Sequence, residues 1–104
     1  MQTIDMFIES LKKENFVEAH EILEKSWKEL KKIDKTEADL QKGLINGATA
    51  IALYLKGKKE PAVRVWATFE KYRDLIDKNS FSDSKSYKIA EKILDEKYKL
   101  YFKT

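Results

Sequence analysis

Apolar residues recur along most of the chain at spacings of three and four, the repeat expected on one face of an α-helix. Five such stretches are separated by short polar segments, and none alternates apolar and polar residues as a half-exposed strand would. Short connections favour antiparallel neighbours. We therefore predict an all-α fold, a compact bundle of about five antiparallel helices, in which residues 1–104 form a single helical domain.

The first two helices are predicted from Thr3 to about Lys13 and from a cap at Asn15 to about Lys32. Asn15 and Glu18 have the spacing of a capping box, in which each side chain would bond the other residue's backbone N–H. The inward positions of the first helix are Ile4, Phe7, Ile8 and Leu11.

The other three helices are predicted at about Thr36–Lys56, at about Pro61–Ile76, and from a cap at Ser82 or Ser84 to about Phe102. Gly57 ends the third helix, and Pro61 suits the first turn of the fourth. The third helix is apolar around most of its circumference, out to Leu55, so we expect it to be the most buried.

Two glycines, Gly43 and Gly47, lie one turn apart in the third helix. Each costs about 1 kcal/mol of helix stability relative to alanine. A close approach by a neighbouring helix would offset that cost. We expect the neighbour to be the second helix, with Trp27 or Leu23 lying over the glycines.

The second helix places a polar cluster on its apolar face. His20, the single histidine of the chain, falls within the predicted stripe, and Glu24 lies one turn beyond it on the flank. Glu21 points well away from the stripe. A polar group in an apolar seam needs a hydrogen-bond partner, so His20 and Glu24 require an explanation. The stripe consists of Phe16, His20, Leu23, Trp27 and Leu30.

These residues resemble a known family, domain-of-unknown-function family 309. Its hallmark, Phe-x-x-Ala-His-Glu-x-x-Glu-x-x-Trp, is matched in full by the segment from Phe16 to Trp27. The run Gly43-Leu44-Ile45-Asn46-Gly47-Ala48 is similar to a second family motif, with Asn46 where glutamine is usual. The resemblance covers roughly Phe16 to Ile76. It implies a compact all-α bundle and implies no biochemical activity.

Composition excludes several chemistries. Without cysteine the chain has no disulfide, thiolate metal site or cysteine nucleophile. The longest apolar region, Leu44 to Leu55, is too short to span a bilayer, and the N-terminus lacks a signal-peptide pattern, so we expect a cytoplasmic protein with no membrane partner. Residues 56–104 carry 13 Lys or Arg and 8 acidic residues, and acids interrupt the basic residues throughout. Such mixing is a weak basis for nucleic-acid binding.

Three interpretations of the cluster remain open. In the structural one, His20 and Glu24 pair with each other, or with Asn46 or Tyr54, between two helices. In the second, they bind a metal ion with Glu37 or Asp39 as a further ligand, although Glu24 replaces the second histidine of the zincin motif. In the third, His20 is a general base that Glu24 orients, and Trp27 is a wall of the pocket.

We favour a small protein-interaction or accessory module that uses no cofactor and binds an unidentified protein partner or a second copy of itself. A homodimer would cover aromatic residues that 104 residues cannot fully bury. The alternative is an enzyme or metal-binding protein that uses His20 and Glu24 in an interhelical cleft between the second and third helices. A second alternative is nucleic-acid binding through residues 56–104.

Overall fold

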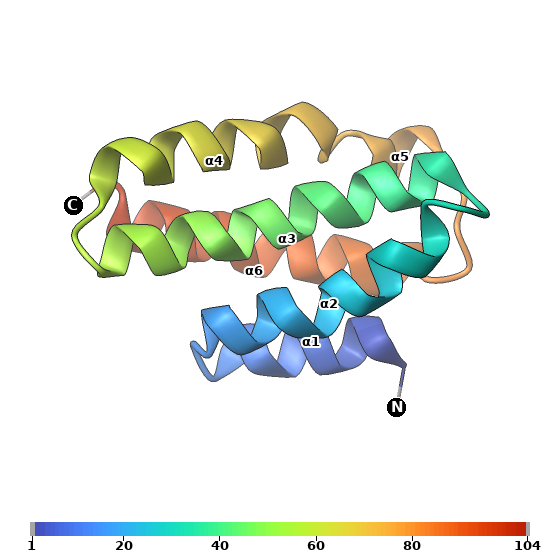
Figure 1. The fold of residues 1–104 in the computed structure, drawn as a ribbon, viewed down its shortest axis with the longest axis horizontal. Helices are drawn as coiled ribbons and strands as arrows, with labels where there is room; N and C mark the ends of the chain where they lie inside the picture. Colours follow the sequence, from blue (N-terminus) through green and yellow to red (C-terminus); the bar gives the residue numbers. More distant parts are fainter. Residues whose placement is uncertain (1, 104) are drawn as a thin grey trace.

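The structure is a computed structural model that describes residues 2–103, and all regular secondary structure in that range is helical (Figure 1). Five main helices and one short one form an all-α bundle, which confirms the predicted fold class. The elements are α1 (Thr3–Lys12), α2 (Phe16–Leu30), α3 (Lys35–Leu55), α4 (Lys59–Tyr72), the short α5 (Leu75–Lys78) and α6 (Ser84–Tyr101).

Helix α3 is the centre of the bundle. It runs through the middle of the molecule and packs against α2, α4 and α6, while α1 packs against α2 and α6 (Figure 1). Its residues are buried along most of its length, as expected, although Leu55 at its end is 49% exposed. The central position follows from the sequence, because α3 is apolar on more than one side.

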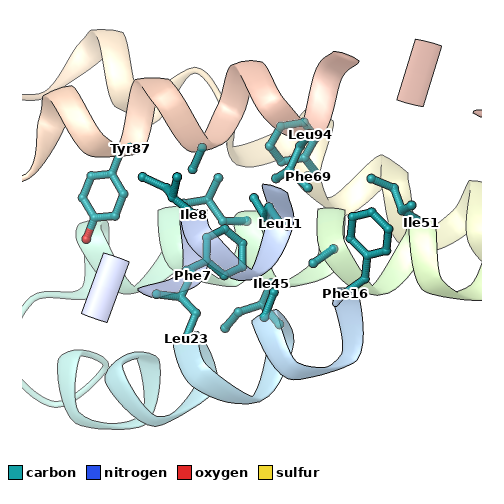
Figure 2. Packing of buried hydrophobic residues seen from close by; sticks show 14 of the residues in the cluster. Phe7, Ile8, Leu11, Phe16, Leu23, Ile45, Ile51, Phe69, Tyr87 and Leu94 are labelled. Carbon is teal, nitrogen blue, oxygen red and sulfur yellow. The ribbon is translucent and has the colours of Figure 1, made fainter. Parts of the chain in front are cut away.

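The core forms where α1, α2, α3, α4 and α6 meet (Figure 2). The predicted inward face of α1 is confirmed, because all four of its apolar side chains are buried. Phe7 and Leu11 from α1 lie among Leu23 of α2, Ile45 of α3 and Leu94 of α6. Burial of such side chains is the main favourable term in the folding of a chain of this size.

The glycines of α3 do meet neighbouring helices, but the expected neighbour was wrong. A Cβ atom at Gly43 would lie 2.9 Å from Cβ of Tyr72 on α4. A Cβ atom at Gly47 would lie 3.0 Å from Cδ1 of Leu94 on α6 and 3.3 Å from the Phe69 ring on α4. Because Gly43 and Gly47 have no side chains, α4 and α6 can approach α3 closely at these positions. Helix α2, which carries Leu23 and Trp27, packs against another part of α3.

The predicted caps of α2 and α3 were also wrong. Asn15 occupies the N-cap position of α2, but its backbone (φ −90°, ψ 70°) is not extended, and its side chain makes no capping hydrogen bond. For α3 the cap is Asp34, whose extended backbone (φ −141°, ψ 95°) lets its carboxylate accept a hydrogen bond from the Glu37 N–H at 3.1 Å. Thr36 lies inside the first turn.

The C-terminal part differs from the prediction in two details. Helix α4 ends at Tyr72, and Ile76 lies buried in the separate short helix α5. Neither Ser82 nor Ser84 caps α6. Ser84 is its first residue, and its hydroxyl accepts a hydrogen bond from the Phe81 N–H at 2.8 Å.

An ion-pair network joins α4 to α6. The Arg73 guanidinium donates to Glu70, Glu91 and Asp95 at 2.9, 2.9 and 3.2 Å, and its side chain is only 19% exposed. Trp66 of α4 stacks on a ring of α6, Tyr98, with 4.3 Å between centroids. These contacts hold α4 and α6 to each other, and both helices pack closely against α3 at its glycines.

The turn between α1 and α2 is tied to α6 through Glu14. Glu14 has a positive φ of 60°, and its carboxylate accepts hydrogen bonds from Lys97 at 2.6 Å and from the Tyr101 hydroxyl. The hydrogen bond from Lys97, followed by that from Tyr101, lowers the pKa of Glu14 below the usual 4.5. One carboxylate thus links the turn between α1 and α2 to the C-terminal part of α6.

Substitution of Gly43 tests the close approach of α4. Gly43→Ala would gain about 1 kcal/mol of helix propensity, but its Cβ would collide with the stem of Tyr72, so we expect a net loss of about 1–2 kcal/mol in the free energy of unfolding. Gly47→Ala is the matched comparison. It meets the flexible end of Leu94 and should lose less. Urea unfolding followed by circular dichroism measures both, and a stabilised Gly43→Ala protein would contradict the contact.

Substitution of Glu14 tests the contact between the α1–α2 turn and α6, because the contribution of this contact to stability should depend on pH. Because the folded pKa of Glu14 is lowered, its contribution to stability is present above the unfolded value near 4.5 and is lost as the pH falls through the folded value. Glu14→Gln should therefore be less stable than the parent at neutral pH, and the difference should vanish in acid. The control is Glu96→Gln, an exposed residue of α6. A difference in stability between Glu14→Gln and the parent that does not change with pH would contradict the proposed contact of Glu14 with α6.

Candidate functional site

His20 and Glu24 form a pair on the edge of α2 that faces α3. The side chains are one helical turn apart, and His20 Nε2 lies 3.0 Å from Glu24 Oε2. Their side chains are 33% and 37% exposed, so the pair is half-buried and open to solvent. The prediction that the two residues pair with each other is confirmed, while the expectation of a pair enclosed between helices is not.

The pair opens onto a cleft between α2 and α3 with a volume of about 300 Å³. Helix α2 provides His20, Glu24 and the half-buried indole of Trp27. Helix α3 provides the opposite wall, made of Lys42, Ile45, Asn46 and Thr49. The spacings of three and four residues on both helices bring these side chains to a common face. The cleft thus combines an apolar surface with several polar groups.

The charge state of the pair follows from its hydrogen bond. The bond with His20 lowers the pKa of the Glu24 carboxyl, and the Lys28 ammonium, 3.6 Å away, acts in the same direction. Glu24 is therefore ionised at neutral pH and can only accept hydrogen bonds. His20 must then carry its hydrogen on Nε2, which leaves Nδ1 as an acceptor whenever the ring is neutral.

The proposed metal ligands do not come together. The Glu37 carboxylate accepts a hydrogen bond from the Tyr87 hydroxyl, and Asp39 pairs with Lys35 at 3.2 Å. Neither residue lines the cleft of His20 and Glu24. Within residues 2–103 no group of three His, Cys, Asp or Glu side chains is placed to hold a metal ion. The pair retains the geometry of a carboxylate-oriented histidine, which can accept a proton.

The remaining motif residues have different surroundings. Phe16 is buried in the core, Glu21 is exposed, and Gly43 and Gly47 contact α4 and α6 as described. Asn46 lines the cleft, but its amide donates to the backbone carbonyl of Lys42 at 2.7 Å and not to His20. The other predicted partner, Tyr54, stacks on Phe102 with 4.3 Å between ring centroids.

Sequence reasoning missed the α3 wall of the cleft. Lys42, Ile45 and Thr49 were assigned no functional role, although together with Asn46 they repeat at spacings of three and four. That spacing could have identified a common face on the third helix, and the expected cleft between the second and third helices is the one that these residues line. Lys31 was also missed. Its ammonium lies 4.6 Å from the centroid of the Trp27 ring.

In the described part of the chain, four of the 13 basic residues of the C-terminal half pair with acids. Arg73 binds three carboxylates, Lys88 pairs with Asp77 and Glu91, Lys97 with Glu14, and Lys99 with Asp95. The acidic partners reduce the positive charge around these four residues, and nucleic-acid binding favours a concentrated basic face. In the described part of the chain, no helix has the length and apolar character needed to cross a membrane.

Comparison with known proteins gives one match. Residues 4–65 match the model of a family described as a domain of unknown function (DUF309). The matched region begins earlier than the predicted Phe16 and ends earlier than Ile76, so it takes in α1, α2, α3 and the first half of α4. Searches of curated proteins and of solved structures found no match. Because the family model covers more than half of the chain, and the His20–Trp27 motif that lines the cleft lies within it, the chain belongs to the DUF309 family.

Proposed function

We propose that the protein is a small interaction module whose α2–α3 cleft receives a side chain of a protein partner. The observation that carries the proposal is the half-buried indole of Trp27 beside an open cleft of about 300 Å³. Tryptophan is enriched among the residues that dominate protein–protein binding energy, where a large apolar ring is packed against a partner. A cleft of this size is at the lower limit for drug-sized ligands, and it suits a single anchoring side chain.

The polar groups of the cleft would provide specificity. The Glu24 carboxylate accepts hydrogen bonds, the Lys42 ammonium donates, and His20 can accept through Nδ1. Ile45 provides an apolar surface between them. A partner side chain with an apolar body and a polar end could contact Ile45 and also bond one of these polar groups, whereas an apolar side chain could contact only Ile45.

Truncation of Trp27 tests this proposal. Trp27→Ala should weaken partner binding at least about thirtyfold, the effect of losing a residue that contributes about 2 kcal/mol or more. Quantitative capture from a lysate of the source cells, followed by mass spectrometry, compares this variant with the parent. The control is Val63→Ala, which removes an exposed apolar side chain of α4 outside the cleft. A captured protein identical to the chain itself would identify the partner as a second copy.

Direct contact is tested by cross-linking. A photoreactive residue at Thr49 in the cleft should form an adduct with the same protein that Trp27→Ala loses, and the same residue at Val63 should not. If Trp27→Ala captured the same proteins as the parent, in the same amounts, the cleft would not be the binding site.

A second candidate function is metal binding or proton transfer by His20. It is supported by the bond of 3.0 Å between His20 and Glu24 and by the opening of this pair onto a cleft that a small molecule can enter. It is second because a catalytic metal ion needs three protein ligands, and the nearest candidates, Glu37 and Asp39, are engaged elsewhere.

The single histidine makes this alternative simple to test. We expect the His20 ring signals in NMR spectra to be unaffected by one equivalent of zinc or manganese, because two half-exposed ligands on one helix bind these ions weakly. Glu24→Gln is the control, since it removes the second ligand and keeps the size of the side chain. Stoichiometric shifting or broadening in the parent, absent from Glu24→Gln, would instead establish a metal site.

A further inference from the structure

Basic side chains outnumber acidic ones around the α2–α3 cleft. Lys42 lines its α3 wall, and in the described part of the chain Glu24 is the one acidic residue that lines it. Two further lysines lie against residues of the α2 wall. The Lys28 ammonium is 3.6 Å from Glu24, and the Lys31 ammonium is 4.6 Å from the centroid of the Trp27 ring. Three ammonium groups therefore accompany a single carboxylate.

The charge of that carboxylate is already balanced. Oε2 of Glu24 lies 3.0 Å from Nε2 of His20, and Oε1 lies 3.6 Å from Nζ of Lys28. The bond with His20, with a further contribution from Lys28, lowers the pKa of Glu24, so Glu24 is ionised at neutral pH and its charge offsets that of Lys28. The surplus charge at the cleft therefore comes from Lys31 and Lys42.

Neither of these two lysines has an acidic partner within residues 2–103. Asp39, the acid nearest to Lys42 in sequence, pairs instead with Lys35 at 3.2 Å. The ammonium of Lys31 is attracted to the Trp27 ring, but its N–H donors still need acceptors. Both lysines are exposed, and they belong to different walls of the cleft, one on α2 and one on α3. A ligand at the cleft can therefore reach both ammonium groups.

The positive charge lies next to the apolar part of the cleft. Trp27 and Ile45 provide apolar surface in a volume of about 300 Å³, and Lys31 lies over the indole itself. A side chain that packs on Trp27 brings the neighbouring residues of its own chain close to an ammonium group. A bare anion or a nucleic-acid backbone would use the lysines and leave this apolar surface uncovered, so an apolar group that carries carboxylates nearby is the better fit.

We propose, building on the function proposed above, that the partner is an acidic protein segment. An apolar side chain of this segment enters the cleft, and the carboxylates of its neighbouring acidic residues contact Lys31 and Lys42. Complementary charges of this kind steer association and disfavour basic partners. A second copy of the chain is a poorer occupant, because its formal net charge of +3 would bring like charges together.

The test is an NMR titration of the full chain with three blocked tripeptides that differ in charge: acetyl-Asp-Phe-Asp-amide, acetyl-Asn-Phe-Asn-amide and acetyl-Lys-Phe-Lys-amide. We expect the acidic peptide to shift the Trp27 indole N–H signal saturably and to bind more tightly than the other two. Trp27→Ala identifies this signal and should weaken binding of the acidic peptide. The indole of Trp66, on α4 outside the cleft, is the internal reference.

Removal of the two lysine charges tests the source of the preference. Lys31→Gln with Lys42→Gln should weaken binding of the acidic peptide about tenfold, the combined effect of two ion pairs at an exposed surface, so that the acidic and neutral peptides then bind with similar affinity. The matched control is Lys85→Gln with Lys92→Gln, which removes the same charge from exposed positions on α6 outside the cleft and should bind like the parent.

The outcomes separate this proposal from the proposed function. If the three peptides bind equally, or if the Lys31 and Lys42 variant binds the acidic peptide as the parent does, the acidic partner is overturned, while a saturable Trp27 shift keeps the cleft as a binding site. If no peptide shifts the Trp27 signal, or if Trp27→Ala binds the acidic peptide as tightly as the parent, both proposals fail. A Trp27 signal that moves with protein concentration alone would place a second copy in the cleft and overturn the acidic partner.

Discussion

Helix α3 can occupy the centre of the bundle because part of its surface carries no side chains. At Gly43 the Cβ of Tyr72, and at Gly47 the side chain of Leu94, occupy the space that a methyl group would need. Each glycine weakens the isolated helix by about 1 kcal/mol, whereas the apolar surface that α4 and α6 bury against α3 stabilises the fold by about 25 cal/mol for each Å². With α4 and α6 held on this side, α2 packs along a different face of α3, and the cleft lies between α2 and α3.

The rotation of α2 about its own axis explains why its polar pair is accessible. The buried side chains of α2 are Phe16, Ala19 and Leu23, so the centre of its apolar face lies close to Leu23. His20 precedes Leu23 by three residues and so lies about 60° from it around the helix, at the edge of the contact with α3. There His20 and Glu24 bond each other while solvent reaches both, which greatly reduces the cost of placing polar groups near an apolar seam.

The sequence predicted the helices and their buried faces well, because amphipathic spacing depends only on local repeats. It could not predict which helix covers a face, and for this reason Gly43 and Gly47 were assigned to the wrong neighbour. It also could not predict the caps, since the value of Asn15 or Asp34 as a cap depends on backbone angles that the preceding turn imposes. The bond between Gln41 and Tyr87 joins residues 46 positions apart, and no local pattern indicates such a pair.

Helix α2 forms a wall of the α2–α3 cleft and also of an acidic cavity near its C-terminal end, which Glu29, Glu37 and Asp83 line. Trp27 lines the cleft, whereas Ser26 and Glu29 line the acidic cavity, because residues close in sequence point to different sides of a helix. A helix held by packed side chains moves as a body, so a ligand that displaces α2 at one site changes the walls of the other.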